Sequence, residues 1–148
     1  MRNIIKTLFM ALVCLGFASC HDDVGYIDPG PQGNPEKEIQ GTYTGTWSQE
    51  YNGEITTAQG TVTFTPTENA YVTNVEVSCP DFNIDMKGIA NVVNFEGGYK
   101  FFNQEASNNG FGVVFDGSVI NKEASIKFTL SVRSGRYQYL YNYTFAGN

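Results

Sequence analysis

Residues 137–145 read YQYLYNYTF, and every second position of this stretch carries an aromatic side chain. Alternation with a period of two places successive side chains on opposite faces of a β-strand. The stretch therefore predicts a strand whose aromatic face is turned toward a core; the aromatic residues are Tyr137, Tyr139, Tyr141, Tyr143 and Phe145. Because an unpaired edge with five aromatic side chains would invite aggregation, we expect this strand to pair with a strand over residues 41–49.

The same alternation recurs from Gly41 onward, in runs rich in aromatic, Val, Ile and Thr residues. Turn-forming residues separate the runs, among them Asn52-Gly53, Gly97-Gly98 and Ser134-Gly135. No segment has a helical periodicity longer than one turn, and the connections are too short for parallel crossovers. We therefore predict an all-β fold, an antiparallel up-and-down β-barrel of about eight strands over residues 39–148. A sandwich of two sheets is the alternative, because pattern alone separates the two poorly.

The first of these runs, Gly41-Thr-Tyr-Thr-Gly-Thr-Trp47, resembles the opening strand of calycin-like β-barrels. These barrels include the lipocalins, whose Gly-x-Trp motif is matched by Gly45-Thr46-Trp47, and the compact calycin-like domains of Bacteroidetes lipoproteins. This sequence also resembles the compact type at Gly88-Ile89 and at the ending Phe145-Ala-Gly147. The resemblance implies a calycin-like barrel. The long loop and C-terminal helix of classical lipocalins are absent, which puts a large ligand cavity in doubt.

Residues 1–19 have the features of a lipoprotein signal peptide. Arg2 and Lys6 precede an apolar run over residues 7–17. This run is too short to span a bilayer as a helix. The segment ends in Phe17-Ala-Ser-Cys20, which resembles the lipobox of bacterial lipoproteins. That resemblance implies cleavage before Cys20, lipidation of Cys20 and attachment to a membrane through the lipid. A plain secretory signal with an incidental cysteine is the alternative.

Residues 20–38 are expected to form a flexible tether, since they contain Pro29, Pro31 and Pro35 and have no hydrophobic periodicity. Asp22 and Asp23 closely follow Cys20. In the Bacteroidetes-type lipoproteins that this signal resembles, acidic residues at these positions look like part of a surface-export signal. The resemblance implies a cell-envelope protein anchored to the outer membrane. Whether it is exposed at the cell surface or faces the periplasm is left open.

The composition of residues 39–148 argues against catalysis. The single histidine, His21, lies in the expected tether, so histidine-dependent triads and His–Cys metal sites are excluded there. Phosphate-binding and calcium-binding loop motifs are absent, and a net charge of −6 opposes nucleic-acid binding. We therefore predict no enzyme activity, no catalytic residue, no metal and no cofactor.

Three remaining features have simple structural interpretations. Asp81 with Asp85, and Glu96 with Asp116, are the carboxylate pairs that histidine-free glycosidase chemistry would need. Such acids are usually solvated residues of strands or turns. Cys79 has no cysteine partner once Cys14 is cleaved off and Cys20 is lipidated, so we interpret it as a small buried side chain.

The aromatic side chains are the positive indication of function. An eight-stranded barrel can hold one small ligand, and tyrosines combine apolar rings with hydroxyl groups. We therefore hypothesise a site made by Trp47, Tyr139, Tyr141 and Tyr143 for a small apolar or amphipathic molecule or a glycan. Two alternatives stay open. These side chains, and Trp47 above all, can simply be packed core, or the protein can be an interaction module, an accessory subunit or inhibitor of an envelope protein, with a filled barrel.

Overall fold

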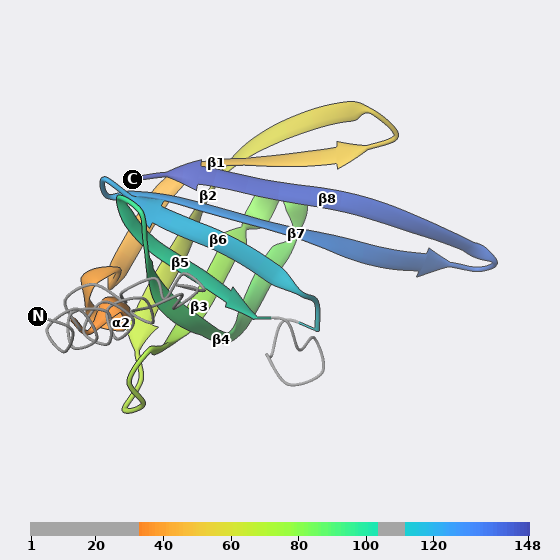
Figure 1. Cartoon of the computed structure of the whole chain (residues 1–148). Helices are drawn as coiled ribbons and strands as arrows, with labels where there is room; N and C mark the ends of the chain where they lie inside the picture. Colours follow the sequence, from red (N-terminus) through yellow and green to blue (C-terminus); the bar gives the residue numbers. More distant parts are fainter. Residues whose placement is uncertain (1–32, 104–111) are drawn as a thin grey trace, which may run out of the picture.

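The structure is a computed structural model that describes residues 33–103 and 112–148 (Figure 1). The expected signal peptide, the lipidation site Cys20 and most of the expected tether lie outside the described residues. Within the described residues, no helix is both long and apolar enough to cross a membrane.

The described part of the chain contains eight strands, and each strand is hydrogen-bonded to its neighbours in sequence. The strands are β1 (Gly41–Tyr51), β2 (Glu54–Pro66), β3 (Val72–Cys79), β4 (Ile84–Phe95), β5 (Gly98–Asn103), β6 (Phe115–Ile120), β7 (Glu123–Ser134) and β8 (Tyr137–Gly147). A short 3-10 turn, η1 (Pro80–Phe82), lies between β3 and β4. All neighbouring pairs are antiparallel, and the order closes on itself, which confirms the predicted up-and-down topology.

The closing contact of this ring is the pairing of β8 with β1. It runs from Gly45 opposite Gly147 to Glu50 opposite Asn142. Beyond it, the main chains of Thr44 and Asn148 exchange hydrogen bonds of 3.0 and 3.1 Å. This confirms the pairing predicted between the aromatic last strand and the first strand, and over this length it leaves neither strand with an open edge.

Two hairpins are longer than the rest of the ring. β1 and β2 are joined by Asn52-Gly53, whose φ angles of 51° and 82° are typical of a type I′ turn. β7 and β8 are joined by Gly135-Arg136, with a φ of 63° at Gly135 as in a type II′ turn. β3 pairs with β2 only from Thr61 onward, and β6 pairs with β7 only as far as Phe128. Both hairpin tips therefore project beyond the ring at the same end, on the right in Figure 1.

Large side chains of the described residues fill the interior of the ring. The largest that are less than 2% exposed are Trp47, Phe64, Phe101 and Phe115. Two glycines allow close approach of strands and rings. A Cβ atom at Gly60 would lie 2.8 Å from the indole nitrogen of Trp47, and one at Gly117 would lie 2.3 Å from the ring of Phe101. The predicted aromatic interior is present as a packed core.

The other end of the ring carries α2 (Pro35–Glu38), a single helical turn within the segment expected to be a tether (Figure 1). Glu36 is only 2% exposed, and its Oε2 accepts a hydrogen bond of 3.0 Å from the main-chain N–H of Tyr71. Ile39, directly after the helix, is fully buried. A proline is tolerated in the first turn of a helix, so Pro35 does not prevent this one. The contacts of Glu36 and Ile39 join this turn to the ring, although its sequence has no periodicity of its own.

Candidate functional site

Exposure falls along the aromatic face of β8. Tyr137 is 71% exposed, Tyr139 and Tyr141 are half-buried, and Tyr143 and Phe145 are buried. The prediction that all five aromatic residues face the interior is wrong for Tyr137, because this residue lies at the tip of a hairpin that runs past the ring. We call the end of the ring with the two hairpin tips the open end; Tyr139 and Tyr141 lie there, where the exposure of the described side chains increases along β8.

Tyr51, the last residue of β1, packs against these side chains. Its ring is stacked on that of Tyr141, with centroids 4.9 Å apart and an interplanar angle of 29°. The centroid of Tyr139 lies 6.0 Å away from that of Tyr51. We call Tyr51, Tyr139, Tyr141 and Tyr143 the tyrosine cluster. Sequence reasoning missed Tyr51 because it ended the first strand at Gln49, although the Asn52-Gly53 turn indicates that the strand continues to residue 51.

Tyr143 forms the deep end of the tyrosine cluster. Its ring is stacked on Phe128, with centroids 5.3 Å apart, and lies 6.1 Å from the ring of Phe82 in η1. Its hydroxyl accepts a hydrogen bond from Nε2 of Gln49. The cluster thus has an apolar floor and an uncharged amide beside it.

Trp47 lies beneath the tyrosine cluster and has no exposed area. Its ring centroid is 5.6 Å from that of Phe128 and 5.1 Å from that of Phe145. Its Nε1 has no hydrogen-bond partner within the part of the chain that the structure describes. The structure therefore brings Trp47 to the predicted site through Phe128, as a core side chain that supports the cluster from below.

The acidic residues considered for catalysis lie at exposed or half-exposed positions. Asp81, Asp85 and Glu96 are exposed, and Asp116 forms a solvent-exposed ion pair of 3.4 Å with Lys127. Across residues 33–103 and 112–148, no group of three or more His, Cys, Asp and Glu side chains is placed to hold a metal ion. The tyrosine cluster offers aromatic surface and hydroxyl groups, which are suited to binding.

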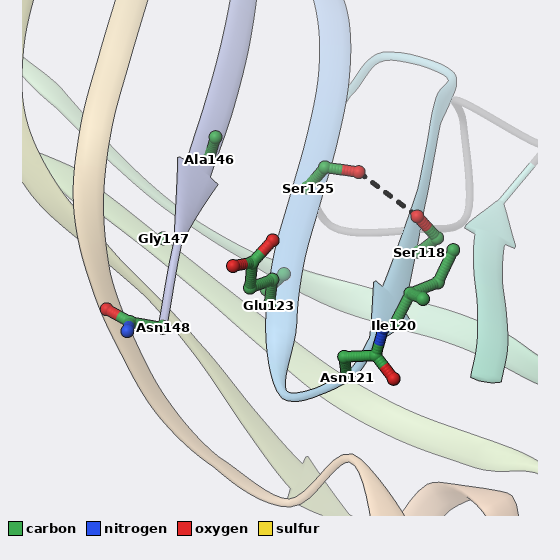
Figure 2. Close-up of a pocket in the computed structure, with 9 residues that line it drawn as sticks. Ser118, Ile120, Asn121, Glu123, Ser125, Ala146, Gly147 and Asn148 are labelled. Carbon is green, nitrogen blue, oxygen red and sulfur yellow. Dashed lines mark hydrogen bonds between the residues drawn. The ribbon is translucent and has the colours of Figure 1, made fainter. Parts of the chain in front are cut away.

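An open hollow of about 600 Å³ lies on the outer face of the ring, beside the β6–β7 turn and the end of β8 (Figure 2). Its polar lining includes Ser118, Glu123, Ser125 and Asn148, and the two serine hydroxyls are hydrogen-bonded at 3.1 Å. None of its described lining residues is a histidine, a cation or an aromatic residue. The two serines therefore have no histidine beside them to act as a base, and the apolar part of the lining consists of small aliphatic side chains such as Ile120, Ala124 and Ala146, without the aromatic surface of the tyrosine cluster.

No protein-family model, curated protein or solved structure matches this chain. The tyrosine cluster and the packed core beneath it are therefore the basis for assigning a function.

Proposed function

We propose that this protein is a non-enzymatic, lipid-anchored binding protein of the cell envelope. Its tyrosine cluster binds a small amphipathic molecule or a glycan at the open end of the ring. The observation that supports this most directly is the stack of Tyr51 on Tyr141, half-buried and above a filled interior. Aromatic rings held in place by packing can bind a ligand with little loss of side-chain entropy.

The chemistry of the cluster suits a ligand that has an apolar face and polar edges. Each tyrosine supplies a rigid ring surface and a hydroxyl that both donates and accepts hydrogen bonds. Gln49 adds an uncharged amide next to Tyr143. Sugar rings and small amphipathic molecules combine apolar faces with hydroxyl groups, so they match both kinds of surface.

The packed interior supports a shallow site. Trp47 and Phe128 occupy the space beneath Tyr143, and an eight-stranded ring is only wide enough for side chains or one small ligand. The ligand would therefore lie on the tyrosine cluster. We also propose that the ring is a calycin-like barrel of the compact type, which the Gly45-Thr46-Trp47 motif in β1 and the closed strand order support.

The place at which the chain joins the ring supports a binding role away from the membrane. α2 lies at the end opposite the two hairpin tips (Figure 1). A tether from a lipidated Cys20 would leave the ring at the α2 end. The tyrosine cluster would then face away from the outer membrane, where a soluble ligand can reach it.

Replacement of Tyr141 by alanine tests this proposal, with Tyr137→Ala as the matched control. Native mass spectrometry of the purified protein identifies a co-purifying compound, and calorimetry with that compound or with the best ligand from a glycan array gives the Kd. Loss of the stacked ring should weaken binding about tenfold or more. Removal of the exposed Tyr137 should have little effect, because no ring contact holds it to the cluster in the described residues.

Two results would contradict the proposal. One is unchanged affinity in a folded Tyr141→Ala protein, as judged by its thermal unfolding. The other is a wild-type protein that binds nothing in either assay, which would favour the second candidate, a protein-interaction module. The filled interior is the observation that favours that candidate.

A further inference from the structure

Among the described residues, the projecting part of β2 has a neighbouring strand on one side only. β1 pairs with it without a bulge, from Tyr51 opposite Glu54 to Gly41 opposite Phe64. On the other side, β3 begins to pair at Thr61. Residues 54–58 therefore form a sheet edge at the open end of the ring.

The turn between β1 and β2 determines which main-chain groups of this edge face outward. Tyr51 and Glu54 close a two-residue turn, so they form a hydrogen-bonded pair, and every second residue of β2 from Glu54 onward bonds to β1. Ile55 and Thr57 therefore direct their N–H and C=O groups away from β1. Both residues are exposed, Ile55 by 68%. At Gln59 the edge becomes covered, because its carbonyl accepts a hydrogen bond from Sγ of Cys79 at 3.6 Å.

This edge lacks the features that usually prevent strands from pairing with other chains. Residues 54–58 read EITTA, without lysine, arginine or proline, and their pairing with β1 contains no bulge. The other projecting edge, on β7, carries Arg133. The β-branched residues at positions 55–57 favour an extended main chain. An edge with these properties can accept an additional strand.

Charge indicates which kind of strand the edge would accept. The charged residues between positions 41 and 66 are Glu50 and Glu54, both acidic, and the whole chain has a net charge of −6. A second copy would carry the same net negative charge to the edge, whereas a basic segment would bring opposite charge. We propose that the β2 edge binds an extended, basic segment of another protein by strand addition. This site uses main-chain groups of Ile55 and Thr57, so it is independent of a ligand on the tyrosine cluster.

Proline at position 57 tests the proposal. Thr57→Pro removes an N–H that points away from β1 and leaves the hydrogen bonds between β1 and β2 in place. Thr57→Ala changes the side chain but keeps this N–H. Ser131→Pro makes the same kind of change on the β7 edge, since Ser131 also directs its main-chain groups outward by its register with β8.

Short random peptides are selected for binding to the purified full-length protein, and the affinities of enriched peptides are measured by fluorescence anisotropy. We expect enriched peptides to be basic, with alternating apolar residues. Thr57→Pro should weaken their binding about tenfold or more, while Thr57→Ala and Ser131→Pro should bind like the wild type. Hydrogen exchange of the Ile55 and Thr57 amides should slow when the peptide binds, a readout on the wild type that holds even if Thr57→Pro unfolds.

Several outcomes would overturn the proposal. They are the absence of enriched peptides, enriched peptides without positive charge, unchanged binding to a folded Thr57→Pro protein, and unprotected amides at Ile55 and Thr57. A dimer in sedimentation that Thr57→Pro abolishes would also overturn it, since the occupant would then be a second copy.

Discussion

Among the described residues, the buried tyrosines Tyr43 and Tyr143 lie at opposite ends of the core, and their hydroxyls are paired differently. Near the open end, the Tyr143 hydroxyl accepts a hydrogen bond from the side chain of Gln49. Near the covered end, the Tyr43 hydroxyl donates a hydrogen bond of 3.1 Å to the main-chain oxygen of Ile39. Burial raises the pKa of Tyr43 above its ordinary value, because a phenolate there would lose its hydration. Tyr43 thus holds the chain just after α2 onto the ring, whereas Tyr143 is the base of a surface that solvent reaches.

Tyr43→Phe should lower stability at neutral pH and reduce its dependence on alkaline pH. Loss of the hydrogen bond to Ile39 should cost about 1 kcal/mol at pH 7. Because the folded-state pKa is raised, the stability linked to this hydroxyl is complete below the unfolded value of about 10 and is lost as pH rises toward the folded value. The free energy of unfolding, measured with urea at neutral and alkaline pH, should therefore fall less steeply with rising pH in Tyr43→Phe than in the wild type. A decline as steep as in the wild type would show that Tyr43 does not titrate this way.

The β1–β2 hairpin uses two glycines for different purposes. Gly53 has a φ of 82° in the turn, and a Cβ atom there would have no neighbour within 4 Å. A Cβ at Gly60 would lie 2.3 Å from the main-chain oxygen of Ser78 and 2.6 Å from the Trp47 ring. The first glycine is therefore required by main-chain conformation, and the second by packing between β2, β3 and the core.

Alanine at these two positions should separate the two requirements. Gly53→Ala should cost about 1 kcal/mol, the price of a left-handed conformation for a residue with a Cβ. Gly60→Ala should cost more, about 1–3 kcal/mol, because strand or ring must shift to admit the methyl group. Denaturant unfolding measures both, and tryptophan fluorescence should change only in Gly60→Ala. Equal costs, or an unchanged Trp47 signal in Gly60→Ala, would be inconsistent with this packing.

The strands and turns could be predicted because they depend on local features. Alternation marks the strands, and Asn52-Gly53 and Ser134-Gly135 are typical of the hairpin turns at which they occur. The overhang of the hairpins could not be predicted, since it depends on where β3 and β6 begin to pair with longer strands. For this reason Tyr137 was expected in the core, whereas Tyr51 was missed because the first strand was ended at Gln49, two residues short of the Asn52-Gly53 turn.

The helix α2 was missed for a different reason. It has four residues, too few for a periodic pattern, and it follows a proline-rich segment. Its stability depends on partners distant in sequence, such as the N–H of Tyr71 that Glu36 binds. Three of the four residues predicted to form the site, Tyr139, Tyr141 and Tyr143, belong to the tyrosine cluster, because they share one face of β8. The fourth, Trp47, lies beneath them because β1 enters the core before it reaches the open end.

At the scale of the whole molecule, the two ends of the ring have different roles. One end is covered by α2 and receives the chain from the expected tether. The other end carries the tips of the β1–β2 and β7–β8 hairpins (Figure 1). These hairpins supply the tyrosine cluster and the β2 edge of the described residues. A lipid anchor at Cys20 would therefore restrict where the molecule is without covering either proposed binding surface.

Replacement of Cys20 by alanine should abolish lipidation and leave the ring unchanged. Each buried methylene of an acyl chain contributes about 0.8 kcal/mol to membrane binding, so several chains on one cysteine hold a protein almost permanently. The wild-type protein should therefore incorporate a fatty-acid label and enter the detergent phase on phase separation, whereas Cys20→Ala should do neither.

Cys79→Ala is the matched control: Cys79 is buried in the ring, so its replacement should lower the melting temperature and leave labelling intact. A labelled Cys20→Ala protein would contradict the anchor. An unlabelled one with unchanged melting and unchanged ligand affinity would show that the lipid sets location while the ring alone binds.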